Sequence, residues 1–254
     1  MTSPTEKEAL VLSKIEDQKE SSVLYLAFGS NLSKNILEKV RKVYPKSATP
    51  VVIPGYALTF DLVGIPYAEP AFANIIPKQG AQLHGVVYEI TRAELFAIFA
   101  TEGGGAGYEQ ISVDWNGKPV FTLMCSRDRR ECYPSRRYVN ILLDGAKQHQ
   151  MPTEYVKRLQ RIRTYEARGL WTKIGSMLFL AFWLPVVYST FRLNSAWAKT
   201  FGKIPLTVMK STRGMFYLMW WYHDQFWSKV FGRGDVVASL PSDDEAFLDE
   251  NTLA

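Results

Sequence analysis

The chain has 254 residues, a hydrophobic content of 47% and a formal net charge of +5. This length fits one full domain with an appendage, and the hydrophobic content excludes a disordered chain. Two cysteines exclude a disulfide scaffold and fit a reducing compartment. Three histidines (His84, His149 and His223), without an HExxH or CxxC motif, argue against a zinc site.

The charge is unevenly divided along the chain. Residues 157–213 contain eleven Lys or Arg and a single acid, Glu166, whereas residues 233–254 contain six acids and one base. A basic block beside an acidic tail predicts a polyanion or a membrane surface as partner. The alternative is a solvated helix face followed by a solubilising tail.

The first half of the chain alternates short apolar runs with turn residues, which predicts strands. These strands are expected over residues 23–28, 51–63, 72–76, 83–90, 111–113 and 120–124. Pro54-Gly55 marks a turn at the second strand, and Asn116-Gly117 is a strong hairpin signal between the last two. The polar residues 1–21 carry no apolar signal segment, so we expect a mobile leader and a protein that is not secreted.

Helical spacing predicts helices over residues 33–43, 91–100 and 152–163, and residues 138–145 fit a strand or a short helix. Thr91 and Glu94 have the spacing of a capping box, and Pro152 suits a helix start. Together, the predicted strands and helices indicate an α+β fold, a small mixed β-barrel-like sheet with a few helices.

Residues beyond 165 have a different composition. Ile174 to Phe191 is a run of eighteen uncharged residues between Lys173 and Arg192, close to the lower limit of ~17 residues for a membrane span. Pro185 interrupts this run, and the Trp-rich residues 215–227 resemble an interfacial segment. We therefore expect membrane contact through residues 170–227, as a helix pair lying in one leaflet. The alternative is that these helices pack on the preceding domain or on a second copy of the chain.

Two segments contain residues suited to chemistry. The strand Tyr25-Leu26-Ala27-Phe28 ends at Gly29-Ser30-Asn31, where the free backbone N–H groups of a helix start can bind a carboxylate or phosphate. In the second segment Glu102 precedes three glycines and, six residues on, Tyr108. Glycines let a ligand approach the backbone, and a carboxylate among apolar neighbours suits a base working near neutral pH. Taken alone, each segment fits a simpler interpretation better: the first as an ordinary turn, the second as a solvated surface loop.

Together these segments resemble the γ-glutamylcyclotransferase family. The family pattern is a Tyr-Gly-Ser-Asn-Leu loop, a Gly-Val-Val-Tyr strand (Gly85 to Tyr88 here), a Glu-Gly loop ending in Gly-x-Tyr, and a Pro-Ser-x-x-Tyr segment (Pro134 to Tyr138). All four occur in this order, over about residues 23–163. The loop at Glu102 and the stretch Phe72-Ala73-Asn74-Ile75 look most like the fungal branch, which includes enzymes that trim glutathione adducts in sulfur-containing secondary metabolism.

The resemblance implies an enzyme that releases 5-oxoproline from a γ-glutamyl peptide, glutathione or a glutathione conjugate. Glu102 matches the catalytic carboxylate, and the implied substrate-binding residues are Tyr25, Leu26, Ala27, Phe28, Gly29, Ser30 and Tyr108. No metal or organic cofactor is implied, and the partner is a small molecule rather than a nucleic acid. Two departures stand out: Phe28 replaces the usual loop Tyr, and no Tyr occurs near Thr122 or Cys125.

We therefore expect a leader (1–21), a catalytic domain (22–165), a basic aromatic extension (166–232) and a disordered acidic tail (233–254). The expected location is cytoplasmic, with membrane association, and the oligomeric state is left open. The alternative function is a non-catalytic γ-glutamyl-binding protein, or a membrane-anchored interaction protein, on the same fold.

Overall fold

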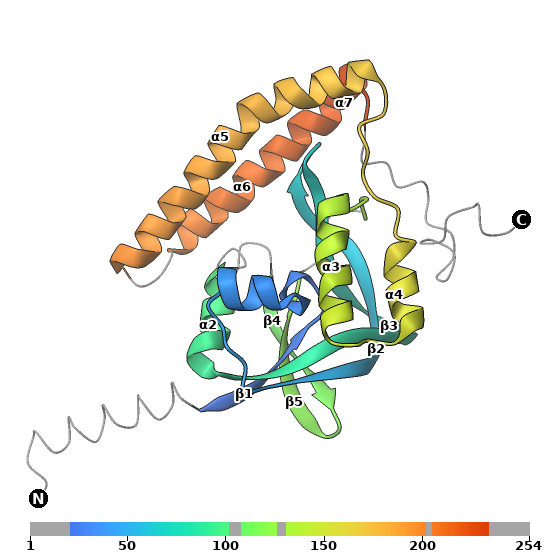
Figure 1. The fold of residues 1–254 in the computed structure, drawn as a ribbon. Coiled ribbons are helices and arrows are strands. Elements are labelled where there is room, and N and C mark those ends of the chain that lie inside the picture. Colours follow the sequence, from blue (N-terminus) through green and yellow to red (C-terminus); the bar gives the residue numbers. More distant parts are fainter. Residues whose placement is uncertain (1–20, 102–107, 126–130, 202–204, 234–254) are drawn as a thin grey trace, which may run out of the picture.

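The computed structural model describes residues 21–101, 108–125, 131–201 and 205–233 (Figure 1). The predicted leader and acidic tail lie almost wholly outside these residues and stay predictions. In the described part, five strands form one mixed sheet in the order β2-β3-β1-β5-β4. The strands are β1 (Ser22–Ala27), β2 (Ser47–Ile65), β3 (Glu69–Thr91), β4 (Glu109–Trp115) and β5 (Lys118–Met124). The expected α+β class and mixed sheet are confirmed.

The helices of the described part lie mainly after the sheet in sequence. They are the 3-10 turn η1 (Ser30–Leu32), the π-helix η2 (Asn35–Val40), α2 (Arg92–Thr101), α3 (Arg136–Gln148), α4 (Thr153–Gln160), α5 (Leu170–Phe201), α6 (Leu206–Tyr222), the π-helix η3 (His223–Trp227) and α7 (Ser228–Phe231). The predicted helix over residues 33–43 is therefore shorter and of π type. Residues 138–145 belong to α3, where Ser135 caps the helix by accepting from the Tyr138 N–H at 3.0 Å.

Two local predictions are confirmed in their detail. Thr91 and Glu94 form a reciprocal capping box at α2: the Thr91 N–H donates to Glu94 Oε2 at 2.8 Å, and the Glu94 N–H donates to Thr91 Oγ1 at 3.2 Å. Asn116 and Gly117, with φ of 55° and 76°, form the two-residue turn between β4 and β5.

The predicted turn at Pro54-Gly55 is wrong, because β2 continues through both residues. β2 is the edge strand, where a proline costs no ladder hydrogen bond. Gly55 has a φ of +81°, and the register with β3 shifts between Pro54 and Tyr56. The break is a bulge in a long β2–β3 hairpin. The partner strand β3 is continuous as well, so the strands expected over 72–76 and 83–90 are one strand.

Strand β1 occupies the centre of the sheet and directs the chain toward the Gly29 turn. It pairs antiparallel with β3 and parallel with β5, where Tyr25 faces Phe121. Gly85 of β3 permits a close approach, since a Cβ at this position would lie 2.7 Å from the carbonyl oxygen of Ala27. The core lies between the sheet and helix α3, and Leu26, Val86 and Leu142 are fully buried in it.

Helices α5 and α6 form a long antiparallel hairpin that extends beyond the sheet (Figure 1). The Asn194 amide donates to Thr212 Oγ1 at 2.9 Å and joins the two helices. The hairpin docks on the turn between β2 and β3: Trp220 Nε1 donates to the Gly64 carbonyl at 2.9 Å, and the Tyr67 hydroxyl donates to the Gly232 carbonyl at 2.8 Å. By length and composition, the Leu170–Asn194 stretch of α5 could cross a membrane.

Candidate active site

The residues that precede the turn at Gly29 form the floor of the candidate site. Tyr25, Leu26, Ala27 and Phe28 are all buried. Thr122 Oγ1 donates to the Leu26 carbonyl at 2.8 Å and fixes β1 to β5 below the turn. These side chains belong to the core, so they shape and support the turn rather than line an open surface.

The turn itself is a single tight 3-10 turn. The Leu32 N–H donates to the Gly29 carbonyl at 3.0 Å, and the Ser33 N–H donates to the Ser30 carbonyl at 3.1 Å. Gly29 and Ser30 are both partly exposed. Their own N–H groups have no acceptor in the described part of the chain, as expected for the first residues of a helical turn. The turn can therefore offer two neighbouring donors to a ligand oxygen.

A buried polar network holds the turn from below. The Asn31 amide donates to the Tyr25 hydroxyl at 2.9 Å. The Tyr88 hydroxyl lies 3.3 Å from the Asn31 carbonyl and 2.8 Å from Nε2 of His149. Burial is the main cause that lowers the pKa of His149, with the nearby Lys34 charge second. Burial likewise raises the pKa of Tyr88. His149 and Tyr88 are therefore both uncharged at neutral pH, which suits their place in the core.

Two tyrosine hydroxyls meet beside Gly29 on the main chain of Ala73. The Tyr108 hydroxyl donates to the Ala73 carbonyl at 2.5 Å, and the Ala73 N–H donates to the Tyr138 hydroxyl at 3.1 Å. A Cβ at Gly29 would lie 3.2 Å from the Tyr138 oxygen and 3.4 Å from the Ala73 Cβ. The fold thus brings Tyr108 and the Gly29 turn, predicted from separate segments, to the same place.

Tyr138 is the residue that sequence reasoning missed. In the sequence, Tyr138 stands out only as the end of the Pro-Ser-x-x-Tyr segment, and it is not among the implied catalytic or substrate-binding residues. Ser135 caps α3, which places Tyr138 in the first helical turn, and its ring packs edge-on against Phe72 with centroids 5.1 Å apart. The Ser-x-x-Tyr spacing indicates a capped helix start, but it does not indicate the contact of Tyr138 with Gly29.

Asn74 forms a buried clamp between β3 and the end of β5. Its amide donates to Asp61 Oδ1 at 2.8 Å and to the Cys125 carbonyl at 3.1 Å, and its own oxygen accepts from the Cys125 N–H at 2.8 Å. Asn74 has no exposed surface. The Phe72 to Ile75 stretch, noted for its likeness to the fungal branch, therefore supplies both this clamp and the Ala73 contacts.

Glu102 lies in residues 102–107, outside the described residues, so its place and its role stay predictions. The elements on either side of this segment are described. Helix α2 ends at Thr101 and packs against β1 and β3. The chain resumes at Tyr108, whose hydroxyl is bonded to Ala73. The elements on both sides of the Glu102 segment therefore contact β3, the strand that pairs with β1 before the Gly29 turn.

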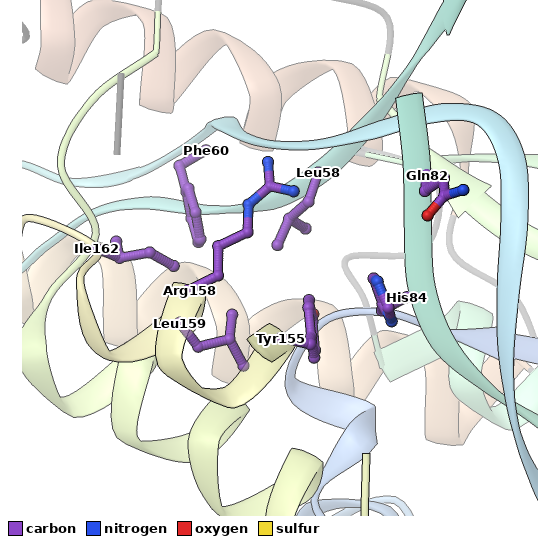
Figure 2. A pocket seen from close by; sticks show the side chains of 8 residues that line it. All are labelled: Leu58, Phe60, Gln82, His84, Tyr155, Arg158, Leu159 and Ile162. Carbon is purple, nitrogen blue, oxygen red and sulfur yellow. The ribbon is translucent and has the colours of Figure 1, made fainter. Parts of the chain in front are cut away.

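A separate hollow lies between β2, β3 and α4 (Figure 2). It encloses about 360 Å³, including open solvent, and its lining consists of Leu58, Phe60, Gln82, His84, Tyr155, Arg158, Leu159 and Ile162. None of the predicted site residues and no carboxylate is among them. His84 stacks on Tyr155 with ring centroids 4.4 Å apart, and burial, then the Arg158 charge, lowers its pKa. His84 is therefore half-buried and packed against α4.

Comparison with known proteins gives matches along most of the chain. The AIG2-like family model matches residues 82–159, and the AclK C-terminal domain model matches residues 169–230, which contain the α5–α7 helices. Gamma-glutamyl cyclotransferase aclK of Aspergillus oryzae is 34% identical over 261 residues, or 89% of this chain and 95% of the relative. Gamma-glutamyl cyclotransferase gliK of Aspergillus fumigatus is 31% identical over 244 residues, or 84% and 89%.

A solved structure of a gamma-glutamyl cyclotransferase has the same fold, with a TM-score of 0.50 and 25% identity over 59% of this chain and 92% of the other. That match covers 59% of this chain, whereas the match to aclK covers 89% of it, and the AclK C-terminal domain model matches the C-terminal helices. Identity above 30% over nearly the whole length of a relative settles the family. The chain belongs to the fungal γ-glutamyl cyclotransferase family, and it is an enzyme of that class.

Proposed function

We propose that this enzyme cyclises the γ-glutamyl group of glutathione or of an S-substituted glutathione and releases 5-oxoproline. One observation carries the proposal: the Gly29 turn, with two neighbouring free N–H groups, lies against the Tyr138 hydroxyl and Ala73, and the Tyr108 hydroxyl is bonded to the same Ala73. The likeness to the fungal branch, whose members trim glutathione adducts, favours a glutathione-derived substrate over a simple dipeptide.

The reaction needs one nucleophile, which the substrate itself supplies. The α-amine nitrogen attacks the γ-carbonyl carbon and forms the lactam C–N bond, and the γ-amide C–N bond then breaks. Because the reaction is intramolecular, the main task of the enzyme is to hold the glutamyl chain folded. The α-ammonium group must first lose a proton, and the departing amine must gain one, so a single acid–base residue can serve both steps.

The roles follow from the positions along the chain. In this proposal the N–H groups of Gly29 and Ser30 donate to the γ-carbonyl oxygen as it becomes an oxyanion. Glu102, which follows α2, takes the proton from the α-ammonium and delivers it to the leaving nitrogen. The phenol rings of Tyr108 and Tyr138 form the wall beside the glutamyl chain. Phe28 is buried, and because phenylalanine has no hydroxyl, the hydroxyl that the family usually has at this position is absent.

A substrate panel tests the proposal on the full-length chain. Glutathione, S-methylglutathione and γ-glutamylalanine are incubated with enzyme, and 5-oxoproline and the released amine are quantified by chromatography. We expect 5-oxoproline and free amine in equal amounts, with at least one of the two glutathione substrates turned over faster than the dipeptide. The matched control is N-acetylglutathione, which keeps the γ-amide but has no nucleophilic amine.

Two outcomes would contradict the proposal. Release of N-acetylglutamate from the control substrate would indicate hydrolysis by water rather than lactam closure. Turnover confined to γ-glutamylalanine would overturn the assignment of glutathione-derived substrates. A glutathione-dependent activity fits a cytoplasmic enzyme, which is the location we propose. The predicted membrane contact of residues 170–227 is a separate proposal, since no step of lactam closure needs a lipid surface.

A further inference from the structure

The largest feature that lactam closure leaves unused is the exposed apolar surface of the α5–α6 hairpin. Met177, Leu178, Phe182 and Tyr188 of α5 are each more than half exposed, and so are Leu218 and Trp221 of α6. Large contiguous apolar surfaces are uncommon on soluble monomers and indicate an interaction site.

Helix α5 buries only a narrow stripe of its surface. The buried positions Gly175, Phe179, Trp183 and Val187 recur every four residues and face the rest of the protein. The remaining positions between Ile174 and Phe191 carry no charge, so α5 is apolar around most of its circumference. Such a helix is typical of a protein core or of an apolar medium.

The charges of the hairpin select an anionic partner. Residues 167–223 contain seven Lys or Arg and no Asp or Glu. Lys173 and Arg192 are exposed at the two ends of the apolar run, and Lys210 and Arg213 are exposed on α6. Exposed cations that border an aromatic and aliphatic face match a negatively charged lipid surface, where headgroups and hydrocarbon adjoin.

Several polar side chains of the hairpin have partners within it, whereas Trp183 Nε1 is buried without a partner among the described residues. The hydroxyls of Ser176 and Thr190 donate to the carbonyls of Lys173 and Val186 in α5, both at 2.8 Å. Thr212 Oγ1 donates to its own helix and accepts from Asn194. Polar groups satisfied in this way do not need water, which suits contact with hydrocarbon.

The contacts with the sheet domain decide how the hairpin can meet a bilayer. Tyr67 packs on Phe179 with ring centroids 5.4 Å apart, and Trp220 donates to Gly64. Phe179 lies inside the uncharged run, so the domain covers one side of the hairpin at that level and lipid could not surround it. We propose that the α5–α6 hairpin lies flat in the headgroup region of an anionic phospholipid bilayer, with the sheet domain on its aqueous side.

Flotation of the full-length chain with vesicles tests this proposal. Vesicles of phosphatidylcholine alone are compared with vesicles that also contain phosphatidylserine, at low and at physiological salt. We expect the chain to float with phosphatidylserine vesicles and to be released as salt rises, because salt screens exposed charges. Flotation with neither vesicle, or equally with both, would overturn the proposal.

Matched variants test the residues involved. In Lys210→Gln with Arg213→Gln, the partition coefficient should fall about fivefold for each charge. Lys157→Gln with Arg161→Gln makes the same charge change on α4 and should leave the partition unchanged. Phe182→Ser should weaken flotation further, while 5-oxoproline release in solution stays at the wild-type rate for every variant. Equal losses in the α4 control would contradict the assignment to the hairpin.

Two further measurements test how deep the hairpin lies in the bilayer and whether the chain associates with itself. Brominated lipids quench tryptophan fluorescence, and the quenching that is present in wild type but lost in Trp221→Phe belongs to Trp221. This Trp221 quenching should be strongest with lipids brominated near the headgroup. A maximum for bromines at the bilayer centre would instead indicate a span and contradict the flat arrangement. Light scattering must show the same oligomeric state for wild type and Phe182→Ser. Dissociation of a dimer by this substitution would assign the face to a second copy of the chain.

Discussion

A methyl group at position 29 tests the geometry of the turn. In Gly29→Ala the new Cβ would lie 3.2 Å from the Tyr138 hydroxyl oxygen, so this hydroxyl must move by a few tenths of an ångström. Gly29 has a φ of −107°, so the substitution does not place a side chain in the left-handed region. The shift lengthens the hydrogen bond from Ala73 to Tyr138, a bond worth about 1 kcal/mol. We expect a loss of about 1–2 kcal/mol in the free energy of unfolding.

Turnover should be more sensitive than stability to this change. A displacement of about 1 Å at a reacting centre can cost 10²-fold, so a shift of tenths of an ångström in the wall beside the turn predicts about a tenfold lower kcat. Urea denaturation measures the first quantity, and 5-oxoproline release from saturating substrate measures the second. Wild-type turnover in Gly29→Ala would refute the assignment of this turn to the substrate site.

A double-mutant cycle tests whether the Tyr138 hydroxyl causes the stability loss in Gly29→Ala. Tyr138→Phe removes the hydroxyl that the methyl meets, so Gly29→Ala should be about 1 kcal/mol less costly in that background. The matched control is Gly214→Ala, because a Cβ there meets nothing within 4 Å. That helical substitution should stabilise the protein by about 0.5–1 kcal/mol. Absence of coupling between positions 29 and 138 would show that the methyl points elsewhere.

Three further predictions concern stability. Gly145→Ala should cost about 2 kcal/mol or more in urea denaturation, because its Cβ would lie 2.6 Å from the main-chain carbonyl carbon of Leu32. Burial lowers the folded pKa of His149 below its unfolded value, so the unfolded chain binds the proton first. The free energy of unfolding should therefore be constant above about pH 6.5 and fall below it, and His149→Gln should reduce that slope. Trp220→Phe removes the 2.9 Å hydrogen bond to Gly64, so the melting temperature should drop by a few degrees, equivalent to about 1 kcal/mol.

Local patterns predicted local structure well. The capping box at Thr91 and the turn at Asn116 depend on residues no more than three apart, and both were predicted with their details. Pro54-Gly55 was misread because the sequence does not show that β2 is an edge strand, where a proline and a bulge are tolerated. The π form of residues 35–40 had no local signal at all.

The candidate site was predicted only in part, because its residues come together from segments that are far apart in the sequence. Family motifs predicted Gly29 and Tyr108, and the fold places both beside Ala73. Tyr138 reaches Gly29 across more than a hundred residues of sequence, through the packing of α3 on the sheet, and no pattern around position 138 encodes that distance. The proposed role of the α5–α6 hairpin depends on which of its sides docks at Tyr67. The composition of the hairpin does not determine that side.

The central claim is that Glu102 and the Gly29 turn form one site for lactam closure. The most direct test is 5-oxoproline release by Glu102→Gln, which keeps the size and polarity of the side chain and removes the base. With the same melting temperature as wild type, this variant should lose about 10²-fold or more in kcat on glutathione or its S-substituted form. Turnover close to that of wild type in a folded Glu102→Gln variant would contradict the account.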